Sequence, residues 1–160
     1  MIMDDITIRK ATIEDLDLLV HWRMEVLHAV FGDAMMQDED VLEHANREYY
    51  VQALRSQEHC ACFALHGAEI VGCGGICLSR EMPSPDNLSG RCAYLMNIYT
   101  CPAFRGYGVG GSVVRWLIKE ARNRHITKIY LETTGEGRNL YINMGFEDMP
   151  DMMKLVKKRL

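Results

Sequence analysis

The chain has 160 residues and a formal net charge of −4, with 48% hydrophobic and 25% charged residues, the balance of an ordinary soluble globular protein. The negative charge argues against general nucleic-acid binding, which usually shows a basic surface, and no apolar stretch approaches the ~20 residues of a membrane span. The first residues lack the pattern of a signal peptide, so we expect one cytoplasmic domain over residues 1–160.

Hydrophobic spacing predicts the elements of the first half. Residues 6–9 form a strand, and a helix follows the N-cap Thr12, with Asp15 three residues on as a variant capping box. The expected inner face of this helix consists of Leu16, Leu19, Val20, Met24 and Leu27. A second helix spans about residues 38–55, and its expected inner face consists of Leu42, Ala45, Tyr49 and Ala53. Residues 60–65 and 70–78 are strands joined by a hairpin at 66–69, and residues 81–87 form an exposed loop.

The second half begins with a strand that ends at residue 100, followed by a glycine-rich turn and an amphipathic helix over residues 112–121. Next come a strand over 128–133, a short helix around 139–144 that ends at Gly145, and a last strand over 152–156. The order β-α-α-β-β-β-α-β-α-β, with hairpins early and a βαβ unit late, predicts an α+β sheet of mixed direction.

The six cysteines suggest neither a disulfide framework nor a metal site. Cys60-x-Cys62 and Cys73-x-x-x-Cys77 lie within predicted strands, and neither has the C-x-x-C spacing of a zinc or redox motif. We therefore expect free thiols that act as small core residues, and no metal.

The glycine-rich turn is the most informative stretch of the chain. It reads Arg105-Gly106-Tyr107-Gly108-Val109-Gly110-Gly111. A glycine-rich turn between a strand and a helix points backbone N–H groups at one place, and the helix start adds partial positive charge. The turn therefore predicts a phosphate-binding site.

Two phosphate-binding patterns fit this turn. Gly106, Gly108 and Gly111 match the dinucleotide fingerprint G-x-G-x-x-G, with Glu132 as the ribose-binding acid. Arg105-x-x-Gly108-x-Gly110, preceded by Pro102 and followed by Tyr141-x-x-x-Gly145-Phe146, instead resembles the GNAT superfamily of acyl-CoA-dependent N-acetyltransferases. A dinucleotide fingerprint belongs in the first βα turn of its fold, whereas this turn comes late, which favours the GNAT pattern.

The GNAT resemblance covers nearly the whole chain and implies a fold, a cofactor and site residues. The implied fold is α+β, with a mixed, mostly antiparallel central sheet flanked by helices on both faces. The implied acyl donor is acetyl-CoA, whose pyrophosphate is held by the turn from Arg105 to Gly111, including Gly106, Tyr107, Gly108, Val109 and Gly110. Main-chain groups near Ile98, Tyr99 and Thr100 then pair with the pantetheine arm.

The resemblance assigns Tyr141 to the departing thiolate. A thiol titrates near ~8.5 and tyrosine near ~10, so a stabilising hydrogen bond is more favourable than full proton transfer. The family often has an asparagine seven residues before this tyrosine, and here that position is Thr134. This departure indicates a subgroup, and the usual contact of that asparagine with the cofactor arm does not carry over to this chain.

The proton acceptor and the amine are less determined. Glu132 and Glu25 are candidate bases, and water is the alternative. The acceptor is a small-molecule or peptide primary amine, and the resemblance suggests a homodimer. The acids at the start of the second helix suit a cationic amine and equally suit the helix dipole: Asp33, Asp38, Glu39, Asp40 and Glu43. Two rivals stay open, a non-catalytic acyl-CoA-binding module and a dinucleotide-dependent oxidoreductase.

Overall fold

The computed structural model describes residues 5–35 and 37–157. Its strands are β1 (Ile6–Lys10), β2 (His59–His66), β3 (Glu69–Arg80), β4 (Arg91–Thr100) and β5 (Lys128–Leu131), and its α-helices are α1 (Leu16–Phe31), α2 (Glu39–Arg55), α3 (Val109–Asn123) and α4 (Arg138–Asn143). The five strands form one sheet in the order β1-β2-β3-β4-β5. The pairs from β1 to β4 are antiparallel, and β4 pairs with β5 in parallel.

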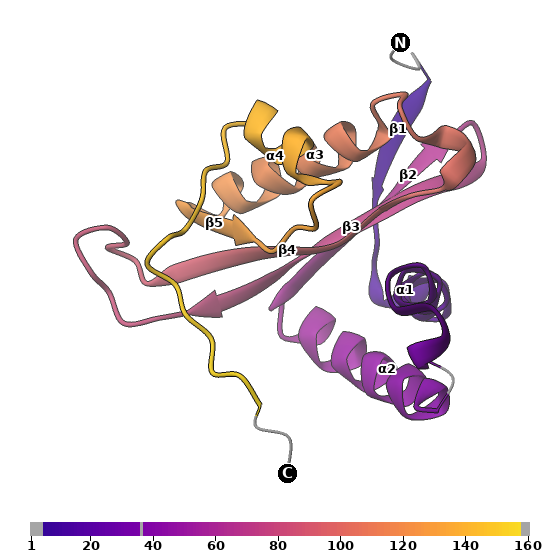
Figure 1. The fold of residues 1–160 in the computed structure, drawn as a ribbon, viewed down its shortest axis with the longest axis horizontal. Helices are drawn as coiled ribbons and strands as arrows, with labels where there is room; N and C mark the ends of the chain where they lie inside the picture. The colour runs from indigo at the N-terminus through magenta and orange to yellow at the C-terminus, as the bar shows by residue number, and fades with distance from the viewer. Residues whose placement is uncertain (1–4, 36, 158–160) are drawn as a thin grey trace.

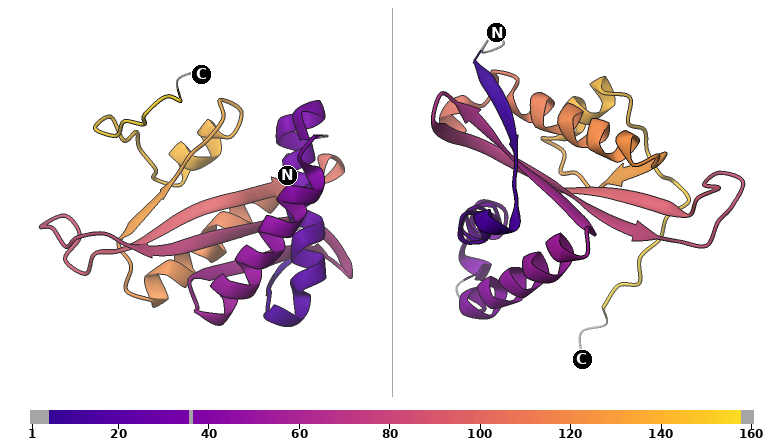
Figure 2. Two further views of the ribbon diagram at one scale, coloured as in Figure 1. Left: turned by 90° about the horizontal axis from the view of Figure 1, so that it is seen from below. Right: turned by 180° about the vertical axis from the view of Figure 1, so that it is seen from behind.

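The helices lie on both faces of this sheet. Helices α1 and α2 cover one face, and α3 and α4 cover the other (Figures 1 and 2). Each face has its own core, because side chains of successive strand residues point to opposite sides. Ile76, Leu95 and Leu117 belong to the core beneath α3, and Phe63 and Leu19 belong to the core beneath α1 and α2. The predicted fold class is therefore confirmed.

Two glycines of β3 bring α3 close to the sheet. A Cβ on Gly74 would lie 2.5 Å from Cγ1 of Val113 and 2.8 Å from Cδ1 of Ile98. A Cβ on Gly72 would lie 2.7 Å from the Tyr99 carbonyl oxygen. Larger residues would push α3 and β4 outward, so these glycines set the height of the α3 start above the sheet.

The first predicted helix face is confirmed and the second is wrong in part. Leu19, Val20, Met24 and Leu27 of α1 are buried as expected. On α2 the buried residues are Tyr50 and Ala53, whereas Ala45 is exposed and Tyr49 is 39% exposed. The buried residues of α2 lie in its C-terminal half, where Tyr50 and Ala53, three positions apart, face inward together.

The last predicted strand is wrong. Residues 152–156 have no strand pairing, and Met153 and Leu155 are 97% and 98% exposed. The chain after α4 runs past the sheet without joining it (Figures 1 and 2). Extended structure is stabilised by a ladder and by burial of one face, and this segment has neither, so its apolar residues do not make a strand here.

All six cysteines are free, and four of them are buried, as expected. Within the described residues, none of the helices combines the length and apolarity that crossing a membrane requires.

Candidate active site

The strands β4 and β5 separate halfway along β4. Their parallel pairing runs from Cys92 opposite Lys128 to Leu95 opposite Leu131. On its other side β4 stays paired with β3 as far as Thr100, which lies opposite Gly72. The outer edge of residues 96–100 therefore has no neighbouring strand among the described residues. We call this opening the β4–β5 fork, and the predicted cofactor residues Ile98, Tyr99 and Thr100 lie along it.

The glycine turn follows the open edge directly. Gly106 and Gly108 have φ values of +83° and +85°, a region that L-residues other than glycine rarely adopt. Gly108 is the N-cap of α3 and provides no side-chain hydrogen bond to the helix start. The first N–H groups of α3 have no acceptor within the helix, so the turn fits an anionic group such as a pyrophosphate.

The mouth of the fork is narrow on the α4 side. A Cβ on Gly110 would lie 3.4 Å from Cδ2 of Leu140 and 3.6 Å from Oγ1 of Thr100. Gly110 therefore keeps open the gap between the start of α3, the end of β4 and the side of α4.

Several side chains of the predicted cofactor residues are already engaged with the protein. Val109 is buried, and Ile98 packs on the α3 core. Arg105 donates from Nε to the carbonyl oxygen of Thr100 at 3.1 Å, and its guanidinium lies 5.7 Å from the ring centre of Tyr99. Arg105 thus holds the end of β4, and the buried Val109 has only main-chain groups to offer a ligand.

Tyr141 lies on α4 with its ring in the α3 core. The ring meets Phe146 edge-on, with the centroids 5.8 Å apart. Gly145 adopts φ +94°, and the N–H of Phe146 donates to the carbonyl of Tyr141 at 3.0 Å, the hydrogen bond of a Schellman motif. The Tyr-x-x-x-Gly-Phe motif is therefore also a helix stop that locks the tyrosine ring in place.

Burial raises the pKa of the Tyr141 hydroxyl above its ordinary value. The hydroxyl stays protonated at neutral pH and is a weaker acid than free tyrosine. It can donate a hydrogen bond to a thiolate, whereas full proton transfer to one is still less favourable than in water.

Glu132 follows directly after β5 and is exposed. Burial and then the Glu132 carboxylate raise the pKa of Tyr94 to about 12, so the two side chains are neighbours. The Tyr94 ring packs on Tyr130 with centroids 5.0 Å apart. The other candidate base, Glu25, is an exposed residue of α1.

Glu132 and Tyr141 line one cavity of about 940 Å³, together with residues of β5, α4 and the C-terminal segment. The glycine turn and residues 96–100 are not among its lining residues. The structure therefore brings the two candidate catalytic residues to one cavity beside β5, and it places the predicted cofactor residues along the β4–β5 fork and in the turn that follows it.

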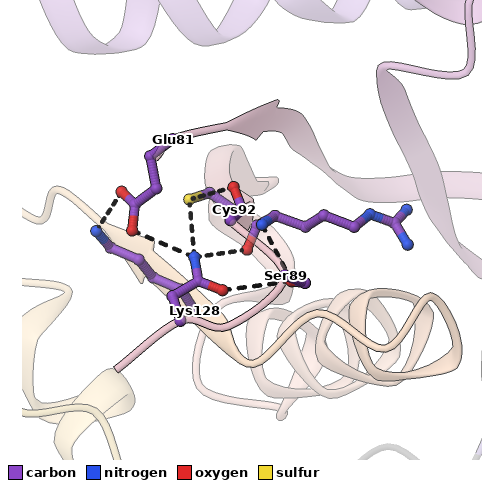
Figure 3. A network of polar contacts seen from close by, with 7 residues as sticks. Glu81, Ser89, Cys92 and Lys128 are labelled. Carbon is purple, nitrogen blue, oxygen red and sulfur yellow. Dashed lines mark hydrogen bonds and ion pairs between the residues drawn. The ribbon is translucent and has the colours of Figure 1, made fainter. Parts of the chain in front are cut away.

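The loop between β3 and β4 differs from its expectation at one residue. Asn87 is buried, and its Nδ2 donates to Oε1 of Glu81 at 3.2 Å and to the carbonyl of Arg91 at 3.1 Å. Figure 3 shows Glu81 meeting Lys128, whose Nζ lies 2.6 Å from Oε2 of Glu81. The loop is thus anchored to the start of β5, and the length of β4 separates it from the glycine turn.

Two further residues lie at the fork and are not singled out by any motif of the sequence, Asn97 and Arg23. Asn97 is in β4 and has a φ of +61°, and Nη1 of Arg23 in α1 donates to its Oδ1 at 3.1 Å. Asparagine is unfavourable inside a strand and tolerates left-handed backbone. That combination is the signal that could have pointed to Asn97, whereas nothing local in the sequence singles out Arg23.

The family model for the acetyltransferase (GNAT) family matches residues 17–146. The chain belongs to this family. The acyl donor of the family is acetyl-CoA, which agrees with the cofactor expected from the sequence. Among curated proteins, no relative matches the chain.

Solved structures of GNAT proteins resemble the chain over nearly its whole length. A predicted acetyltransferase from Clostridium acetobutylicum, solved with acetyl-CoA, is 27% identical with a TM-score of 0.84, covering 94% of this chain and 96% of that one. A GCN5-related N-acetyltransferase from Ralstonia eutropha is 22% identical (TM-score 0.81; 94% and 98% covered). Glucosamine-6-phosphate N-acetyltransferase from Arabidopsis thaliana is 18% identical (TM-score 0.69; 96% and 99% covered).

The sheet topology contradicts the alternative of a dinucleotide-dependent oxidoreductase. A dinucleotide-binding fold needs a largely parallel sheet with its glycine turn after the first strand. Here the turn follows β4, and among the strands of residues 5–35 and 37–157 only the β4–β5 pair is parallel.

Proposed function

We propose that the protein is an N-acetyltransferase that moves the acetyl group of acetyl-CoA directly to a primary amine while both are bound. The observation that carries this proposal is the position of the glycine turn at the end of the open edge of β4. A single extended ligand with a pyrophosphate at one end can lie along both.

The turn is proposed to hold the pyrophosphate. Main-chain N–H groups near Gly106, Gly108 and Gly110 approach the phosphates without a side chain between them, and the start of α3 adds partial positive charge. The carbonyl and N–H groups on the outer edge of residues 96–100 bind the pantetheine arm as a neighbouring strand would.

Acetyl-CoA, when bound, supplies a thioester whose acetyl carbon accepts the electron pair of the amine. The C–N bond forms, the C–S bond breaks, and the thiolate leaves with its electron pair. A main-chain N–H at the open edge of β4 polarises the thioester carbonyl. The Tyr141 hydroxyl stabilises the departing sulfur by a hydrogen bond, and its raised pKa keeps it in the donor form.

The amine must lose a proton to react. An amine with a pKa near ~10 is mostly protonated at pH 7. Water is proposed to accept this proton, because Glu132 is exposed and has only its place after β5 and beside Tyr94 to favour it. The acceptor class is a primary amine on a small molecule or a peptide.

The test combines binding and turnover. Calorimetry should detect binding of acetyl-CoA to the protein. NAD should leave the melting temperature of the protein unchanged, because only a ligand that binds the native state raises it. A panel of polyamines, amino acids, aminoglycosides and lysine peptides should include an amine that releases free CoA thiol. Acetyl-CoA binding without turnover across a broad panel would favour the non-catalytic module instead, and absence of acetyl-CoA binding would refute both.

A further inference from the structure

The β4–β5 fork coincides with a bulge in β4. Cys73 of β3 lies opposite Tyr99, yet Gly75 lies opposite Met96, so Asn97 and Ile98 together face the single residue Gly74. Two residues against one define a β-bulge, which bends its strand and ends regular pairing. Asn97 has the left-handed φ of +61° and stands two positions after the last β4–β5 pair, at Leu95. The fork therefore depends on a left-handed backbone conformation, which costs asparagine less than most residues but still persists best where the surrounding structure supports it.

That support comes from the helices on the α1 and α2 face. Nη1 of Arg23 donates to Oδ1 of Asn97 at 3.1 Å, and Nε of the same guanidinium donates to Oδ1 of Asn46 in α2 at 3.2 Å. Nδ2 of Asn46 in turn donates to the carbonyl of Leu42 at 2.8 Å. Sγ of Cys73, which lies in the same core as α1, donates to the Asn97 carbonyl at 3.5 Å.

The chain of contacts is partly buried and joins three elements. Arg23 reaches from α1 to α2 and to β4, and its guanidinium is held by two amide oxygens rather than by a carboxylate. The three nitrogens of a guanidinium lie in a common plane. Two hydrogen bonds donated in different directions therefore leave the group little freedom to move. A contact of this kind fixes where the Asn97 side chain lies, and through it the backbone of the bulge.

We infer that Arg23 is a positioning residue for acetyl transfer, acting through Asn97 to hold the bulge of β4 so that the open edge after it faces the thioester. The inference rests on the proposed function for its kinetic part. Arg23 is not proposed to touch the acetyl group or to take a proton, so its loss should lower kcat without altering how the glycine turn binds the pyrophosphate.

The first experiment compares Arg23→Met with Arg47→Met. Arg47 lies on α2 and pairs with Asp17 of α1 on the exposed surface, so its loss removes an arginine from the same helix pair without touching β4. Arg23→Met should lower kcat by about 10- to 100-fold, because a small displacement of a reacting group has that effect, with the acetyl-CoA Kd within about twofold of the parent. Arg47→Met should match the parent in both constants.

A double-mutant cycle then asks whether Arg23 acts through Asn97. In Asn97→Gly the glycine adopts the left-handed backbone without needing the contact. Once this glycine is present, Arg23→Met should cost less than about twofold further. An equal cost of Arg23→Met in both backgrounds, or a kcat of Arg23→Met equal to that of the parent, would overturn the inference.

A readout that needs no turnover separates this inference from the proposed function. The amide resonances of residues 96–100 should move in Arg23→Met and stay in place in Arg47→Met. If the protein binds acetyl-CoA but acetylates nothing, the proposed function fails while these resonances still test the contact. Unmoved resonances in Arg23→Met would show that Arg23 does not hold the bulge.

Discussion

Replacing Gly110 by alanine should stabilise the protein and weaken its affinity for acetyl-CoA. Gly110 is the second residue of α3, and alanine is a better helix former by up to ~1 kcal/mol. The new Cβ would lie 3.4 Å from Leu140 Cδ2 and 3.6 Å from Thr100 Oγ1, ordinary contact distances that cost the fold nothing. For a protein of this size the melting temperature should rise by about 2–4 °C at most.

Binding should change in the opposite direction. The added methyl fills the gap between α3, β4 and α4, which lies between the turn proposed to hold the pyrophosphate and the open edge of β4 proposed to hold the pantetheine arm. We expect the methyl to displace the cofactor enough to lose one hydrogen bond between a main-chain N–H of the turn and the charged pyrophosphate. Such a loss costs about 1.5–3 kcal/mol, so the Kd for acetyl-CoA should rise by about 10- to 100-fold. Valine at the same position should weaken binding further, because its two branches occupy more of the gap.

The assay is calorimetry with acetyl-CoA beside thermal melting of the same samples. Asn123→Ala is the matched control, because Asn123 ends α3 at its opposite end and is exposed. The control should keep the parent Kd. A folded Gly110→Val protein with the parent Kd would refute the reasoning. Valine fills the gap, so unchanged affinity would mean that the cofactor does not occupy it.

Tyr141→Phe should keep the acetyl-CoA Kd and lower kcat by ~10²-fold; equal turnover, with chemistry shown to limit the rate, would leave Tyr141 as a packing residue. The turnover rate should rise with pH as the amine loses its proton, and Glu132→Gln should keep that profile if water is the acceptor. A large selective loss of turnover in Glu132→Gln would instead identify Glu132 as the base. Burial lowers the pKa of His59 to about 4, and the nearby Arg23 charge lowers it to a smaller extent. Between pH ~6.5 and ~4 the imidazole of His59 is therefore protonated in the unfolded chain and neutral in the native protein. Stability should therefore fall across that range by about 3 kcal/mol, and His59→Gln, which keeps a partner for Tyr49, should flatten the decline in melting temperature; parallel curves for parent and variant would show that His59 is not buried and neutral.

Local sequence patterns predicted most of the elements, because each pattern reports an interaction that forms within a few residues. The glycine turn needs positive φ at Gly106 and Gly108, and only glycine meets that need cheaply. Tyr141 and Gly145 are close enough in sequence for one helix end to join them. The family could be expected from these two motifs alone.

The predictions that are wrong concern features that depend on contacts between distant parts of the chain. Nothing in residues 152–156 tells whether a neighbouring strand is within reach, and the structure leaves Met153 and Leu155 in solvent. The spacing of apolar residues in α2 predicts that Tyr49 faces inward, whereas the next residue, Tyr50, is the buried one. The packing of the helix on the sheet determines which side of it is covered. Asn87 was expected in an exposed loop and is buried by its bonds to Glu81 and Arg91.

Residue type and short spacing are enough to predict the family, the order of nearly all elements and the turn that fits a pyrophosphate. The point at which β4 separates from β5 is set by contacts between distant parts of the chain: it depends on β3, on the bulge at Asn97 and on Arg23, which is 74 positions before Asn97. Contacts of that separation leave no local pattern, and they form only when the helices pack on the sheet.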